Sequence, residues 1–141
     1  DSEITAFTEQ GLLNPATNAP IAPGQPTPRT PDSSYRMSVE KDFMQGDANT
    51  VTARISHTWQ DDVNLDPFGT YGANQSSFGL TDAVISWSAN DGLWSADLYG
   101  KNLSNEFYKT GSYFYSIVLG STQQAQIAEP RTYGLRFRRN F

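Results

Sequence analysis

The chain has 141 residues and no cysteine, which excludes disulfide bridges and thiolate metal sites. Its net charge of −5 argues against nucleic acid as a partner, because phosphate binding needs clustered Lys and Arg. Only 37% of the residues are hydrophobic, and no run reaches the roughly 18 apolar residues of a transmembrane helix. Aromatic residues nevertheless make up 13%, and a membrane-spanning β-strand needs only about 9–11 residues of alternating character.

Segment 1–34 shows no sustained periodicity. Its central part, 14–28, is rich in proline, which lacks a backbone donor and is incompatible with the interior of a helix or a strand ladder. We therefore expect 1–34 to be one long loop.

An alternating pattern begins at residue 35 and predicts a hairpin. Successive side chains of a strand point to opposite faces, so every second residue shares a face. In the first strand, 35–43, the mostly apolar face contains Tyr35, Met37, Val39 and Phe43. In the second strand, 50–59, it contains Val51, Ala53, Ile55, His57 and Trp59. The polar segment 44–49 reads as the turn, and pairing Glu40 with Arg54 places Tyr35 opposite Trp59.

A second hairpin is expected after the loop at 61–79. Strands over 81–88 and 94–101 alternate in the same way, and the Asp91-Gly92 pair between them is a hairpin signal. Closing this hairpin with Trp87 opposite Trp94 places Ile85 opposite Ala96.

The last strand, 131–141, follows a third long loop at 103–130. The apolar face of this strand carries Tyr133, Leu135, Phe137 and Phe141, and Arg139 is the one charged residue among them. A chain that ends on a two-faced strand with a terminal aromatic residue is typical of outer-membrane barrels. The connections also alternate between long and short, as in barrels with long outer loops and short periplasmic turns.

The aromatic residues gather at both ends of the apolar face. One end carries Tyr35, Trp59 and Tyr133, and the other carries Phe43, Trp87, Trp94 and Phe141. Two aromatic girdles around an aliphatic band predict a wall that faces lipid. Five strands cannot close, because the smallest membrane barrels need about 8. We therefore expect all-β, antiparallel transmembrane strands over 35–141 that form the C-terminal part of a larger barrel. The remainder of the barrel would be another chain or a missing segment.

Two motifs carry a family resemblance. Segment 98–108, Leu-Tyr-Gly-Lys-Asn-Leu-Ser-Asn-Glu-Phe-Tyr, resembles the Gly-Lys-Asn-Leu segment of TonB-dependent outer-membrane receptors, and segment 130–141 resembles their closing Pro-Arg-x-Tyr-Gly strand. The resemblance implies a barrel of about 22 strands around a plug, in the bacterial outer membrane. It also implies uptake of a ferric siderophore, cobalamin or an oligosaccharide, with the TonB complex acting on the plug. Segments 1–34, 61–79 and 103–130 would be extracellular loops.

The candidate ligand-binding residues are a loop cluster of aromatic side chains, Phe107, Tyr108, Tyr113, Phe114 and Tyr115. Aromatic rings suit stacking on a siderophore or a sugar, but they equally suit packing of the loop or contact with lipid head groups. On the inward face the expected charged side chains are Arg36, Glu40, Arg54, Asp97, Lys101, Arg136 and Arg138. This mixture fits contact with a plug or a polar channel.

No enzyme, cofactor or metal site is predicted. His57, the single histidine, shares the apolar parity, and no arrangement with a nucleophile is recognisable. The Asp62-Val-Asn-Leu-Asp66 sequence resembles the start of a calcium loop, but Pro67 stands at the sixth position and Ala73 at the twelfth. Two alternatives stay open: a passive porin-type barrel and a soluble β-sandwich that binds carbohydrate. A sandwich would bring Ile55, Leu98 and Leu135 into a dry interior.

Overall fold

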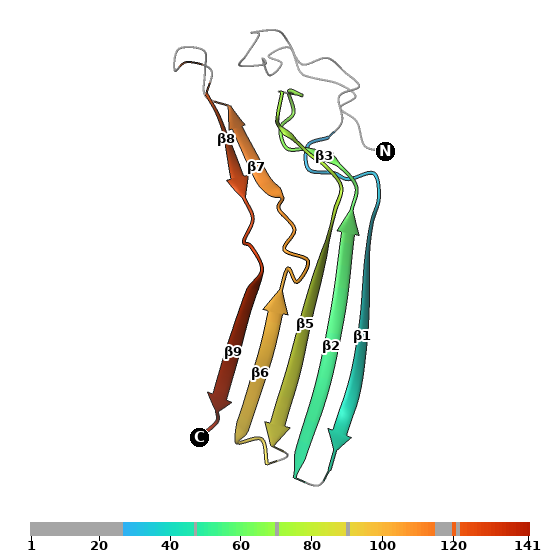
Figure 1. Cartoon of the computed structure of the whole chain (residues 1–141), viewed down its shortest axis with the longest axis vertical. Helices are drawn as coiled ribbons and strands as arrows, with labels where there is room; N and C mark the ends of the chain where they lie inside the picture. Colours follow the sequence, from blue (N-terminus) through green and yellow to red (C-terminus); the bar gives the residue numbers. More distant parts are fainter. Residues whose placement is uncertain (1–26, 47, 70, 90, 115–119, 121) are drawn as a thin grey trace. The chain divides into compact units, whose positions relative to one another are not determined.

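A computed structural model describes residues 27–46, 48–69, 71–89, 91–114, 120 and 122–141 (Figure 1). Over these residues the chain is all-β, with antiparallel sheets and no helix, which confirms the predicted secondary-structure class. None of the described segments forms a helix long and apolar enough to cross a membrane. Residues 1–26 lie outside the described part, so the predicted loop at 1–34 stays a prediction.

The chain divides into two compact units. The first, which we call the hairpin unit, comprises Asp1–Ser34, Gln60–Phe78 and Phe107–Ala128. The second, which we call the sheet unit, comprises Tyr35–Trp59, Gly79–Glu106 and Glu129–Phe141.

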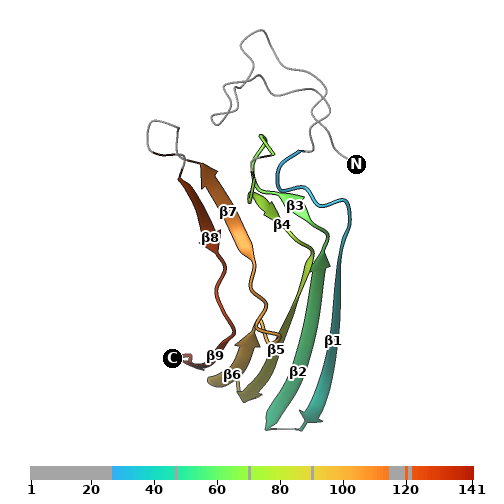
Figure 2. The ribbon, with the colours of Figure 1, turned by 45° about the horizontal axis from the view of Figure 1, so that its top comes forward.

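The sheet unit is a single five-stranded antiparallel sheet. In spatial order its strands are β1 (Ser34–Gln45), β2 (Asn49–Gln60), β5 (Phe78–Ala89), β6 (Trp94–Lys101) and β9 (Thr132–Arg139). All five strands expected from the alternation are present. Figures 1 and 2 show them side by side in one curved layer. Among the described residues the sheet does not close, because β1 and β9 are its two edges.

Side-chain contacts in the first hairpin agree with the predicted register. Tyr35 stacks on Trp59, with 5.6 Å between the ring centroids. Nearer the turn, Thr52 Oγ1 donates a hydrogen bond of 2.7 Å to Asp42 Oδ1. Both contacts join residues that face each other when Glu40 is opposite Arg54.

The predicted register of the second hairpin is wrong by two residues. Trp87 lies opposite Ala96 rather than Trp94, and Ile85 lies opposite Leu98. The ladder extends to the turn because the Gly92 N–H donates to the Ala89 carbonyl at 2.9 Å and Gly92 adopts a φ of 72°. The last pair of the ladder is therefore Ser88 with Ser95, and the chain reverses over the residues between them, whereas the predicted register leaves only Asn90 and Asp91 for the turn. A shift of two residues keeps every side chain on its predicted face.

Strands β6 and β9 are joined by two reciprocal tyrosine–glycine pairs. Tyr99 lies opposite Gly134, and Gly100 lies opposite Tyr133. A Cβ on Gly134 would collide with the Tyr99 ring, and a Cβ on Gly100 would lie 2.6 Å from the Leu103 side chain and 3.1 Å from the Tyr133 ring. One ring therefore covers a glycine on each face of the sheet, and only glycine leaves room for it.

The hairpin unit contains four short strands in segments where no strand is predicted. They are β3 (Val63–Asn64), β4 (Asn74–Gln75), β7 (Lys109–Phe114) and β8 (Gln123–Ile127). Strand β3 pairs with β4, and β7 pairs with β8. The longer strands are recognised by alternating hydrophobicity. Strands β3 and β4 are too short to show this alternation, and β8 is too polar.

A small core and polar contacts hold the hairpin unit. Among the described residues the buried apolar side chains are Val63, Leu65 and Ala73. The Lys109 Nζ donates to the carbonyls of Gly72 and Asn74, each at 2.9 Å. These bonds connect the two small sheets, because Lys109 opens β7, Asn74 opens β4 and Gly72 lies just before β4.

Candidate functional site

The apolar face of the sheet unit is open to solvent. Met37 is 66% exposed, Val39 68% and Leu135 73%. Other exposed large apolar side chains of this face are Tyr35, Phe43, Ile55, Ile85, Leu98, Tyr133, Phe137 and Phe141. Ile55, Leu98 and Leu135 therefore do not converge on a dry interior within this unit. A sandwich buries the equivalent face under a second sheet about 10 Å away.

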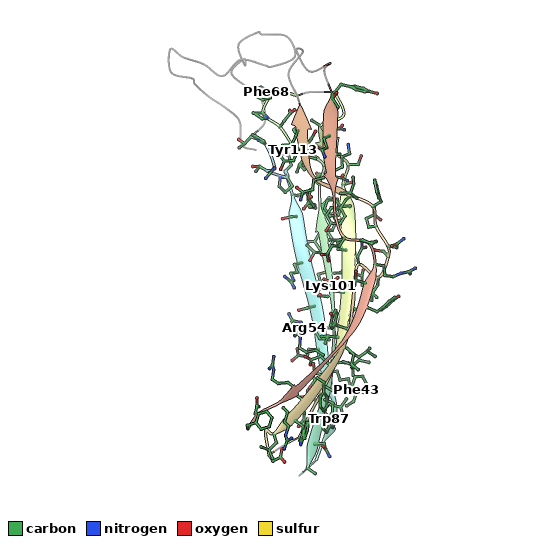
Figure 3. The ribbon with its side chains drawn as sticks, turned by 90° about the vertical axis from the view of Figure 1, so that its left-hand side faces the viewer. Phe43, Arg54, Phe68, Trp87, Lys101 and Tyr113 are labelled. Carbon is green, nitrogen blue, oxygen red and sulfur yellow. The ribbon has the colours of Figure 1, made fainter. Side chains whose placement is uncertain are left out.

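Aromatic side chains lie at both ends of this apolar face. At one end Tyr35 stacks on Trp59. At the end with the short turns, where Figure 3 labels Phe43 and Trp87, Trp94 contacts Phe137 with 5.2 Å between ring centroids. The predicted exception, Arg139, belongs to this end, because its guanidinium lies over the rings of Trp94 at 4.7 Å and Phe141 at 4.8 Å. These contacts are cation–π interactions.

The opposite face carries a charged cleft of about 330 Å³. All five strands of the sheet contribute to its lining. The lining residues are Arg36, Arg54, Ser56, Asp82, Ala83, Val84, Asp97, Tyr99, Gly100, Lys101 and Arg136. Five of the charged residues predicted for the inward face are in this lining, whereas Glu40 and Arg138 are not. Figure 3 labels Arg54 and Lys101 along the middle of the sheet.

Both carboxylates of this cleft already have partners. Asp97 Oδ2 lies 3.8 Å from Arg136 Nη1, across the β6–β9 ladder. Asp82 Oδ1 accepts a hydrogen bond of 2.9 Å from the backbone N–H of Asn102. Asp82 and Tyr99 are cleft residues that sequence reasoning missed, although their parity already placed them on the polar face. What the sequence did not provide was the alignment of the neighbouring strands.

The Gly-Lys-Asn-Leu motif forms a turn that fastens the end of β6. Asn102 is buried and has a φ of 50°. Its Nδ2 donates to the carbonyls of Glu106 at 2.9 Å and Glu129 at 3.3 Å, and its Oδ1 accepts from the Glu106 N–H at 2.8 Å. Asn105 Oδ1 accepts from the N–H of Arg131 at 3.1 Å. The turn thereby holds the backbone that leads into β9.

The predicted ligand-binding aromatic residues have different surroundings. Tyr108 stacks on Phe78, with 4.2 Å between ring centroids. Phe107 is 72% exposed, and Tyr113 lines a shallow depression with Gln124, Ala125 and Gln126. Among the described side chains, Phe107 and Tyr113 make no ring contact with each other. The Phe114 side chain and Tyr115 lie outside the described part, so their ligand-binding role stays a prediction.

The residues weighed for metal binding and catalysis have structural contacts. In the part of the chain that the structure describes, no group of three or more His, Cys, Asp or Glu could hold a metal ion. Asp66 Oδ1 accepts the Phe68 N–H at 3.0 Å, while Val63 and Leu65 fill the core between the acidic positions. His57 Nδ1 shares a hydrogen bond of 2.9 Å with Thr81 Oγ1.

Comparisons with models of protein families, with curated proteins and with solved structures find no match. The fold defines the chain as an all-β protein with antiparallel sheets.

Proposed function

We propose that this chain is the C-terminal wall of a TonB-dependent outer-membrane receptor, which takes up a ferric siderophore, cobalamin or an oligosaccharide. The observation that carries the proposal is the single-layer sheet, with one apolar face uncovered within its unit and one charged face behind it. An exposed apolar patch of this extent is typical of a membrane or protein interface.

Burial in hydrocarbon accounts for the apolar face. Moving a large aliphatic or aromatic side chain out of water contributes about 1.5–3 kcal/mol. Leu98 and Leu135 face each other across β6 and β9 and are both more than half exposed. Lipid tails would cover this pair, whereas the charged residues behind the sheet would stay in a polar interior. Aromatic side chains at both ends of the face suit the two membrane interfaces.

The two free edges support a larger barrel. Strand β1 has 12 residues and strand β9 has 8, and within the described sheet each pairs on one side only. Unpaired backbone groups in hydrocarbon cost several kcal/mol each, so membrane-spanning sheets must be closed. Further strands from the remainder of the protein would pair with both edges. That remainder would also supply the plug and the segment that contacts the TonB complex.

The structure bears differently on the soluble sandwich and on the passive porin. A soluble sandwich is disfavoured, because no second layer covers the apolar face within the sheet unit. A passive porin would have the same wall, and the distinction lies in the companion polypeptide. The motifs at 98–108 and 130–141 favour the receptor through their resemblance to that family.

A spin-label experiment tests the membrane wall. The natural absence of cysteine allows a single label at Leu135→Cys, with Ser86→Cys on the opposite face as the matched control. In liposomes that contain the complete barrel, the label at 135 should collide with oxygen dissolved in the lipid, and the label at 86 with a water-soluble nickel complex. Equal access of the nickel complex to both labels contradicts the proposal. Co-purification with TonB then separates a receptor from a porin.

A further inference from the structure

Three cations in the charged cleft have no acidic partner. Within the described residues, Arg36, Arg54 and Lys101 form no ion pair, whereas Arg136 pairs with Asp97. Glu40, which the register of the first hairpin places opposite Arg54, does not come within ion-pair distance of it. The lining of the cleft therefore holds two more cations than carboxylates, four against two, although the chain as a whole carries a net charge of −5.

The two carboxylates of the cleft contact groups other than these cations. The backbone N–H of Asn102 holds Asp82, and that turn is buried and internally hydrogen-bonded. Asp97 lies opposite Arg136 in the β6–β9 ladder, and the Arg136 guanidinium also lies 5.9 Å from the centre of the Tyr99 ring. Like charges on one face of a sheet are destabilising without a counter-charge. An anion bound in the cleft would supply such a counter-charge.

We propose that the cleft binds a small polyanion that carries carboxylate or phosphate groups. Arg36 and Arg54 provide planar forks that fit two oxygens of such a group, and Lys101 provides a third positive charge. Ser56 adds a hydroxyl donor and Tyr99 an aromatic wall. The volume of about 330 Å³ is in the range of small-molecule sites. This inference concerns the polar face alone and does not require the other face to be in a membrane.

Calorimetric titration of the purified full chain in detergent tests this site with two separate probes, citrate and pyrophosphate. The citrate titration reports carboxylate recognition, and the pyrophosphate titration reports phosphate recognition. The variants are Arg36→Gln and Arg54→Gln. Arg138→Gln is the matched control, because Arg138 lies on the same face, carries the same charge and is outside the cleft. A charge-assisted hydrogen bond contributes enough that each cleft variant should raise Kd about tenfold. The control should stay within about twofold, as expected for a screened surface charge.

The same set of variants also tests whether a loss of binding reflects misfolding and whether the cleft prefers a different ligand. Arg54→Lys keeps the charge but loses the fork, so it should bind more weakly than wild type and more tightly than Arg54→Gln. Circular dichroism verifies that all variants keep the β-sheet signal. Absence of binding for both probes overturns the site, and so does an equal loss with Arg138→Gln. Binding of an acidic peptide, with no binding of citrate or pyrophosphate, also overturns it in favour of a polypeptide partner. The spin-label result is independent of all these outcomes.

Discussion

The buried Asn102 turn gives the most specific stability prediction. Asn102→Asp changes one amide group to a carboxylate of the same size, and aspartate tolerates the left-handed backbone conformation observed here. The accepted bond from the Glu106 N–H is kept. Both donated bonds, to the carbonyls of Glu106 and Glu129, are lost. A carboxylate oxygen would instead face two carbonyl oxygens.

The magnitude follows from these two bonds. Each net hydrogen bond contributes about 0.5–1.5 kcal/mol, and a buried acceptor left unsatisfied costs about 1–3 kcal/mol. Asn102 as a whole residue is only 6% exposed, so water cannot replace the lost donors. We expect Asn102→Asp to lower the free energy of unfolding of the sheet unit by about 3 kcal/mol.

Asn105→Asp is the matched control. Asn105 also has a positive φ, of 56°, and its Oδ1 accepts the Arg131 N–H, which an aspartate retains. This exposed substitution should change stability by less than about 0.5 kcal/mol. Urea unfolding of the full chain, followed by tryptophan fluorescence, measures both variants. If the two substitutions destabilise the protein equally, the Asn102 side chain does not fasten β9 as described.

Two further predictions concern packing and the hairpin unit. Gly134→Ala should destabilise the chain by about 1–3 kcal/mol, because its Cβ meets the Tyr99 ring, and adding Tyr99→Ala should recover part of the loss. Strictly additive effects in the same urea assay would contradict this steric coupling. Lys109→Met removes both bonds to the 72–74 segment, so exchange of the Leu65 amide, which donates to Ala73, should become at least tenfold faster. Unchanged exchange at Leu65 in hydrogen–deuterium measurements would show that Lys109 does not hold this hairpin closed.

The long strands could be predicted because one physical signal repeats in them. In β2, side chains from Val51 to Trp59 alternate without interruption, and such a pattern fixes the face of every residue. The register was harder, because a shift of two residues leaves this pattern unchanged. The turn around Gly92 decides the pairing, and its geometry depends on backbone hydrogen bonds that composition does not specify.

The hairpin unit and the charged cleft were less visible in the sequence. Strand β8 carries glutamines on both faces, so its pairing with β7 has no hydrophobic signature. Asp82 and Tyr99 join the cleft through strand neighbours that are far apart in the chain. The role of Asn102 in the turn likewise depends on Glu129, 27 residues away.

The tyrosine–glycine pairs impose a rule on sequence change. Exchanging Tyr and Gly in both dipeptides, at 99–100 and at 133–134, would again set each ring against a glycine. Exchange in one dipeptide alone would set two tyrosines against each other and leave two glycines facing an empty space. A side chain at position 100 would also meet Leu103, so relatives of this chain should keep each glycine wherever they keep the tyrosine opposite it.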